Sequence, residues 1–123
     1  MIVIIAGGRD YLERRGDMDW LKRLADNYHI RRIVHGGAMG ADELGSRLAD
    51  ALDLELETHP VLPWIWEMVG RGAGPMRNEY MVKRRGAQAA VIFPGGRGTA
   101  DLERRARAAG MVIFKPYSME AEQ

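Results

Sequence analysis

Short apolar runs alternate along the chain with segments in which apolar residues recur every three or four positions. Residues 1–6 form a continuous, largely β-branched run, which is typical of a strand buried on both faces in a parallel sheet. Further short runs predict strands over residues 31–35, 54–59, 88–93 and 111–115. The helical spacing predicts helices over residues 17–28, 41–52, 75–85 and 99–109. Asp17 and Thr99 are placed to cap the first and the last of these helices.

Strands that alternate with helices need crossover connections, and these produce a parallel sheet with helices on both faces. The sequence therefore predicts an α/β fold: a single three-layer Rossmann-like domain around a mostly parallel five-stranded sheet. The strand at 54–59 alternates polar and apolar residues, which favours a place near the sheet edge. Residues 61–74 follow no single periodicity and are predicted to hold a short helix within a long loop. The domain is expected to span residues 1–115, with residues 116–123 as a C-terminal tail.

The composition bounds the size of the core and the class of partner. With 123 residues and 46% hydrophobic content, the chain can bury the core of one ordinary domain. The formal net charge of +1 gives no sustained field for a polyanion, which argues against a nucleic-acid partner and an anionic membrane. Cysteine is absent and no apolar run approaches the length of a membrane span, so a cytoplasmic location is expected.

Glycine-rich loops follow three of the predicted strands. In open α/β sheets, ligands bind beyond the carboxyl ends of the strands, where helix amino termini present unpaired N–H groups. Without a Cβ atom, the backbone can approach a phosphate closely, and Arg9, Arg77 and Arg97 could add bidentate hydrogen bonds. The predicted phosphate-binding residues in these loops are Gly7, Gly8, Arg9, Gly36, Gly37, Ala38, Gly95, Gly96, Arg97, Gly98 and Thr99. Tight strand-to-helix turns also need glycine, so any one loop alone leaves both interpretations open.

Four segments carry a resemblance to a known family. They are residues 7–11, 35–42, 74–78 and 93–99. In this order and spacing they resemble the YspA-type branch of the SLOG superfamily, and the match runs from residue 1 to about 115. The resemblance implies a Rossmann-like nucleotide-binding domain. The wider superfamily includes the lonely-guy phosphoribohydrolases, which cleave the N-glycosidic bond of nucleoside monophosphates, the DNA-processing DprA proteins, and sensor domains for nucleotide signals.

The resemblance also implies roles for residues around the last loop. In the phosphoribohydrolases, a Pro-Gly-Gly-x-Gly-Thr-x-Glu motif holds the phosphate and supplies a catalytic carboxylate, and an arginine from the preceding helix completes the pair. Residues 94–99 match the motif, and Asp101 takes the glutamate position with a side chain one methylene shorter. Arg77 matches the arginine, and Asn78 replaces the lysine that follows it. Arg77 and Asp101 are thus the implied catalytic residues and Asn78 an implied ligand contact. Alternatively, Asp101 is a helix acid paired with Arg105, and Arg77 is a solvated helix charge.

Two functions fit these residues. The first is a sensor or sequestering module that binds a nucleoside monophosphate or an ADP-ribose-like ligand. The alternative is a phosphoribohydrolase, whose carboxylate would stabilise oxocarbenium character on the ribose as the base departs. No cofactor is predicted, and no metal, since His29 and His59 have no partner arrangement that suggests one. Trp64 and Trp66 could stack on a base or pack the loop. A homodimer is expected only because related superfamily enzymes are commonly dimers.

Overall fold

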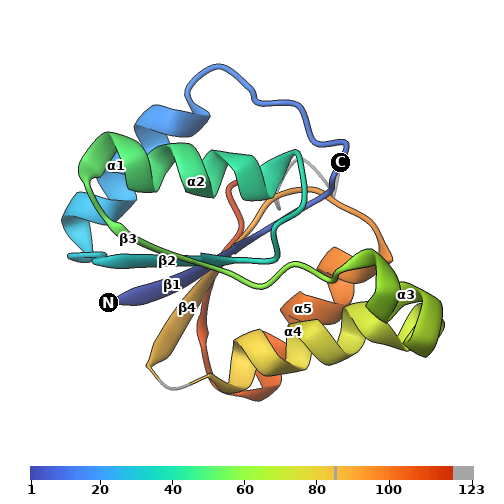
Figure 1. Ribbon diagram of the computed structural model, residues 1–123. Coiled ribbons are helices and arrows are strands. Elements are labelled where there is room, and N and C mark those ends of the chain that lie inside the picture. Colours follow the sequence, from blue (N-terminus) through green and yellow to red (C-terminus); the bar gives the residue numbers. More distant parts are fainter. Residues whose placement is uncertain (85, 118–123) are drawn as a thin grey trace.

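The computed structural model describes residues 1–84 and 86–117, and it has the predicted α/β fold of Rossmann-like layout (Figure 1). The strands are β1 (Ile2–Ala6), β2 (Arg32–His35), β3 (Glu55–Thr58), β4 (Ala87–Ile92) and β5 (Val112–Phe114). The helices are α1 (Asp17–Asn27), α2 (Ala41–Leu52), α3 (Pro63–Val69), α4 (Ala73–Lys83) and α5 (Arg97–Ala108). A short 3₁₀ helix, Gly70–Gly72, joins α3 to α4.

The five strands form a sheet in the order β3-β2-β1-β4-β5, and all described pairs are parallel. β1 lies in the middle, where Val3 is opposite Ile33 of β2 and Ala89 of β4. The chain moves outward from β1 to β3 on one side, then returns to β4 and moves outward to β5 on the other. The strand order therefore reverses between β1 and β4, which is where open α/β sheets bind ligands. β3 is at an edge of the sheet, as predicted.

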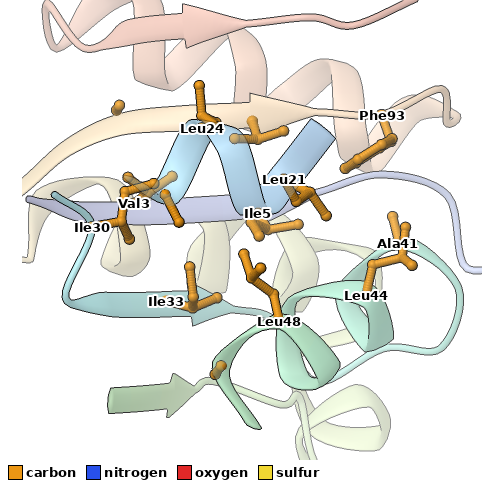
Figure 2. Close-up of a cluster of buried hydrophobic side chains, with 14 residues drawn as sticks. Val3, Ile5, Leu21, Leu24, Ile30, Ile33, Ala41, Leu44, Leu48 and Phe93 are labelled. Carbon is orange, nitrogen blue, oxygen red and sulfur yellow. The ribbon is translucent and has the colours of Figure 1, made fainter. Parts of the chain in front are cut away.

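Alternate residues of the central strands point to opposite faces of the sheet and fill two cores. Val3 and Ile5 pack with side chains of α1 and α2, among them Leu21, as Figure 2 shows. On the other face, Ile4 packs with α4 and with Leu102 of α5. Figure 1 accordingly shows α1 and α2 on one side of the sheet and α4 and α5 on the other. This arrangement confirms the prediction of a parallel sheet between two helical layers.

The prediction of a long loop over residues 61–74 is wrong, although the short helix within it is present. Pro63 begins α3, where its fixed φ suits the first turn. Gly70, with φ of +71°, ends that helix, and the chain continues through the 3₁₀ turn into α4, which begins at Ala73. No residue of α3 is buried, so its apolar residues follow no core-facing period that a sequence pattern could reveal. The expected end of α4, residue 85, lies outside the described residues.

Both predicted helix caps are wrong. Gly16 and Gly96 occupy the N-cap positions of α1 and α5, and no side chain caps either helix. Thr99 lies inside the first turn of α5. Asp17 begins α1 and is 3% exposed, and its carboxylate accepts a hydrogen bond of 2.6 Å from the Tyr11 hydroxyl. Asp17 therefore organises the loop after β1 instead of capping the helix.

Tyr117 packs against that same loop. Its hydroxyl donates a hydrogen bond to Asp17, and the Arg14 guanidinium carbon lies 4.1 Å from the centre of its ring. Burial and the hydrogen bond to Asp17 raise the pKa of the Tyr11 hydroxyl far above its usual value. Tyr117, which was expected to belong to the tail, thus packs with the domain, and residues 118–123 lie outside the described part of the chain. Within that part, no helix combines the length and the apolar character needed to cross a membrane.

Candidate functional site

A cleft of about 1060 Å³ opens at the carboxyl ends of β1 and β4, where the strand order reverses. Its walls are the loops after β1, β2 and β4, the first turns of α4 and α5, and Trp66 of α3. The cleft brings together the predicted site residues Gly7, Gly8, Arg9, Gly36, Ala38, Arg77, Asn78, Gly95, Gly96, Arg97, Gly98, Thr99 and Asp101. Gly37 lies outside this lining, and a Cβ atom there would come within 2.9 Å of the Pro60 side chain.

The loops after β1 and β4 are in direct contact. The N–H of Gly8 donates a hydrogen bond of 2.9 Å to the carbonyl of Pro94. A Cβ atom on Gly95 would overlap the Thr99 hydroxyl and lie 2.6 Å from the backbone nitrogen of Gly8. A Cβ atom on Gly7 would overlap the first residue of α2. Close packing of the fold therefore requires glycine at these positions, with or without a ligand.

Gly96 and Gly98 differ from the glycines that packing requires. Both line the cleft, and neither has a positive φ. Apart from its chain neighbours and the backbone of its own helix, no heavy atom of the described residues would lie within 4 Å of a Cβ atom on either. Gly96 is the N-cap residue of α5, and no side chain caps this helix. The first turn of α5 thus lies in the cleft lining without a side-chain cap, at the positive end of the helix dipole. Such helix ends bind phosphate groups readily.

The N–H groups of the loop after β2 already have partners. Asp42 is buried near the start of α2, and one carboxylate oxygen accepts hydrogen bonds of 3.1 Å from both Gly36 and Ala38. The N–H of Gly37 donates a hydrogen bond of 2.9 Å to Nδ1 of His35. The amides of residues 36–38 were predicted to bind phosphate, but here they hold their own loop in shape.

His35 is a buried structural histidine. Because Nδ1 accepts the hydrogen bond from Gly37, the proton lies on Nε2, which donates to the Ser46 hydroxyl at 2.6 Å. Burial lowers the pKa of His35, and the charge of Arg77 acts in the same direction, so the ring is neutral at pH 7. Within residues 1–84 and 86–117, no group of three histidine or acidic side chains is arranged to hold a metal ion.

Asp42 has an unusual titration. Burial raises its pKa to about 6, although the two N–H donors and the charge of Arg77 favour the ionised carboxylate. In the unfolded chain an aspartate titrates near pH ~3.9. A carboxyl group whose pKa is higher in the folded protein contributes its full stabilisation below its unfolded pKa. That contribution is lost as the pH rises through the folded value.

We therefore expect Asp42→Asn to gain stability relative to the wild type as the pH rises from about 4 to about 7. Asparagine keeps an oxygen acceptor for Gly36 and Ala38 but carries no charge to desolvate. The expected gain is up to about 3 kcal/mol, from a pKa difference of about two units. Urea unfolding of both proteins across this range measures it, and the titration of other groups cancels in the difference. A difference that stays constant with pH would mean that Asp42 titrates normally.

Arg77 ties α4 to the ends of β2 and β3. Its Nη1 donates hydrogen bonds to the carbonyls of Gly36 (2.7 Å) and His59 (3.2 Å), and its Nε donates to Oδ1 of Asn78 (3.1 Å). Burial lowers the pKa of the guanidinium, and the nearby Asp42 carboxylate opposes this effect. The interpretation of Arg77 as a solvated helix charge is therefore wrong. It lies in the cleft wall as a clamp between segments far apart in the sequence.

Asp101 uses both of its carboxylate oxygens within the protein. Oδ1 accepts a hydrogen bond from Arg104 (2.6 Å), and Oδ2 accepts from Arg105 (2.9 Å) and from Nδ2 of Asn78 (3.1 Å). Partial burial opposes ionisation, but the hydrogen bonds from Arg105 and Asn78 outweigh it and lower the pKa of Asp101. Asn78 is buried and also donates to the carbonyl of Gly98 (3.0 Å). The pairing of Asp101 with Arg105 is confirmed.

Exposed arginine side chains also line the cleft. Arg9 follows β1, Arg71 lies in the 3₁₀ helix, and Arg97 begins α5. All three are exposed, and no hydrogen bond or ion pair within the described part of the chain engages them. Asp10 is exposed too, while the other acidic residues of the lining have the donors described above. The groups left to meet a ligand are therefore mostly cationic.

Asp42, Trp66 and Arg71 line this cleft but were not among the predicted site residues. Asp42 had a detectable signal, because it lies on the apolar side of a helix directly after a glycine loop, where an ionised side chain needs N–H partners. For Trp66, the sequence left open whether the indole stacks on a base or packs the loop. Arg71, between two glycines, gave no local signal, because its place depends on how α3 and α4 pack.

The chain is 37% identical over 122 residues to the Gene 61 protein of Mycobacterium phage D29, and the alignment covers 91% of this chain and 93% of that protein. No protein-family model matches the chain, and no solved structure matches it. Identity at this level over nearly the full length of both chains indicates common descent. This chain belongs to the family of the Gene 61 protein of Mycobacterium phage D29.

Proposed function

We propose that this chain binds a phosphate-bearing nucleotide or nucleotide derivative in the cleft, as a sensor or sequestering module of the YspA-type SLOG kind. The ligand is a nucleoside monophosphate or an ADP-ribose-like compound, with a phosphate at the first turn of α5. The four sequence motifs support the family, since each of them contributes residues to the lining of the cleft. The position of the cleft at the reversal of strand order supports a small-molecule ligand.

Gly98 is the observation that carries this proposal. Glycine within a helix is less favourable than alanine by about 0.5–1 kcal/mol. At Gly98 neither the backbone conformation nor packing requires glycine, since φ is not positive and, outside its own helix backbone, no described heavy atom would lie within 4 Å of a Cβ atom. Gly98 lines the cleft in the first turn of α5, however, so a methyl group there would take up space where a phosphate would approach the start of the helix. Close approach of an anionic ligand therefore explains this glycine.

The unpaired arginines agree with such a ligand. Arg9 lies in the loop after β1, Arg97 is the first residue of α5 after the loop that follows β4, and Arg71 lies in the α3–α4 connection. Guanidinium groups bind phosphate oxygens through charge-assisted, often bidentate hydrogen bonds. The net charge of the whole chain is only +1, so this local excess of cations concerns the cleft and not the surface at large.

The environment of Asp101 favours binding over hydrolysis. To stabilise an oxocarbenium ion, a carboxylate must bring a negatively charged oxygen close to the ribose. Here Arg104 and Arg105 both donate to Asp101, and Asn78 donates to the same oxygen as Arg105. The charge is largely neutralised within the protein, and the side chain is a methylene shorter than the glutamate of the family motif. We therefore place ligand binding first and the phosphoribohydrolase second.

A mixed-ligand experiment tests this order. The protein is incubated in excess with a pool of nucleoside 5′-monophosphates, NAD and ADP-ribose compounds, and the filtrate and the denatured protein fraction are analysed by chromatography. We expect one compound to be retained intact with the protein. Free base in either fraction would establish the phosphoribohydrolase instead. A pool that is neither retained nor cleaved would overturn the proposal for these ligand classes.

Gly98→Ala tests where the phosphate lies. We expect the retained compound to bind about tenfold more weakly or worse. The free energy of unfolding should rise by about 0.5 kcal/mol, because alanine favours the helix. Gly72→Ala is the matched control, since Gly72 has φ of −73°, its nearest atom to a Cβ is at 3.6 Å, and it lies outside the cleft lining. Unchanged binding by Gly98→Ala would contradict a phosphate at the start of α5.

A further inference from the structure

α3 is an apolar helix that has no buried residue. Its sequence, PWIWEMV, adds no side chain to either buried core cluster. Figure 1 shows α3 beside α4, on the side of the molecule toward which the strands run. A surface helix normally buries one apolar stripe against the core, so the composition of α3 needs another explanation. Trp66, one of its two tryptophans, is the residue of α3 that lines the cleft.

The two tryptophans of α3 have different surroundings. Residues two positions apart lie about 200° apart around a helix, so Trp64 and Trp66 point in nearly opposite directions. Trp64 is 57% exposed and lies outside the cleft lining, whereas Trp66 lines it and is 40% exposed. The end of the Trp66 ring rests on the first turn of α4, since a Cβ atom on Gly74 would lie 3.4 Å from its Cη2. The indole is thus supported by α4 and still open.

We propose that Trp66 is the platform on which an aromatic base of the ligand stacks, so that the cleft selects compounds in which such a base is joined to a phosphate-bearing sugar. This inference rests on the proposed function, because it takes the phosphate to lie at the start of α5. A planar base over the indole would cover aromatic surface that is now exposed. The cleft, at about 1060 Å³, has room for a base and sugar beyond the phosphate.

Binding of matched probes to the full chain tests the platform. The probes are the four common nucleoside 5′-monophosphates, ribose 5-phosphate and inorganic phosphate. We expect at least one nucleotide to bind the wild type about tenfold more tightly than ribose 5-phosphate. Trp66→Ala should weaken that nucleotide about tenfold and leave ribose 5-phosphate unchanged, while Trp66→Phe should keep most of the affinity. Trp64→Ala, on the same helix but outside the cleft lining, should change neither.

Tryptophan fluorescence distinguishes stacking from a purely structural role of Trp66, because a structural role would not quench the emission when a nucleotide binds. Stacking of the base on Trp66 should quench the emission of the wild type during the titration, and the same titration of Trp66→Phe should show no quenching. Trp20 and Trp64 remain in that variant as internal references. Trp20 lies against Phe93 with ring centres 6.4 Å apart, outside the cleft lining.

The outcomes separate this inference from the proposed function. If ribose 5-phosphate binds the wild type as tightly as every nucleotide does, or if Trp66→Ala weakens both probes equally, the stacking platform is overturned while phosphate binding stands. Full nucleotide affinity in Trp66→Ala also overturns it. If none of the probes binds the wild type, the proposed function fails for these ligands and the platform fails with it.

Discussion

Gly95→Ala is expected to lower the free energy of unfolding by about 2–3 kcal/mol, although it adds a single methyl group. The new Cβ atom would overlap the Thr99 hydroxyl and lie 2.6 Å from the backbone nitrogen of Gly8. The Thr99 side chain can rotate, but the backbone of Gly8 is held by its hydrogen bond to the Pro94 carbonyl. The loops after β1 and β4 must therefore separate. Thermal unfolding should show a melting temperature lower by about 10 °C.

Gly98→Ala is the control for this prediction, because it makes the same change only three residues later. Gly95 lies in the loop before α5, and Gly98 lies in the first turn of that helix. A Cβ atom there would meet no described heavy atom within 4 Å outside the backbone of its own helix, so this variant should unfold no earlier than the wild type. The pair separates a glycine that the fold requires from one that we propose the ligand requires. Equal destabilisation of both variants would remove that distinction and, with it, the main support for a phosphate at the start of α5.

The sheet and its covering helices were predictable because burial leaves a regular pattern of apolar residues in each. The central strands are apolar throughout, and the helices have apolar residues every three or four positions. β1 is central, and its uninterrupted apolar run reflects burial of successive residues on opposite faces. The failures have different causes. Asp17 resembles a helix cap locally, but its carboxylate is engaged by Tyr117, 100 residues away. α3 has no buried face, so no period reveals its length.

The convergence of the glycine-rich loops on one cleft was predictable from the sequence, but the contacts that each loop residue makes within the fold were not. Glycines after parallel strands converge on one edge of the sheet, so the three loops meet at the cleft. A glycine is required for packing when a Cβ atom at its position would overlap other atoms of the fold. The sequence alone does not show which atoms lie nearby in space. Gly95 and Gly98 look alike in the sequence and differ in this respect. From the sequence, the loop after β2 was predicted to bind phosphate as well. In the structure, the N–H groups of Gly36 and Ala38 donate hydrogen bonds to the Asp42 carboxylate instead.

Arg77→Ala should be the most destabilising change of a charged residue in the cleft, by about 2–4 kcal/mol. It removes the donor to the carbonyls of Gly36 and His59 and the positive charge near Asp42. Arg77→Lys should restore little, because an ammonium group lacks the planar fork that reaches several acceptors. Urea unfolding measures the loss of stability. In Arg77→Ala the pKa of Asp42 should also rise above about 6, which carboxyl-carbon NMR can follow.

Arg97→Ala is expected to behave in the opposite way, although both arginines line the same cleft. Arg97 is exposed and has no partner among the described residues, so its loss should change the free energy of unfolding by less than about 0.5 kcal/mol. The proposed function predicts that nucleotide affinity should nevertheless fall, because a phosphate at the start of α5 would lie beside this guanidinium. If instead Arg77→Ala were as stable as the wild type and had lost ligand binding or base release, Arg77 would be the ligand-facing residue that the family resemblance implies. The hydrogen bonds of Arg77 between α4 and the loop after β2 would then contribute nothing to the free energy of unfolding.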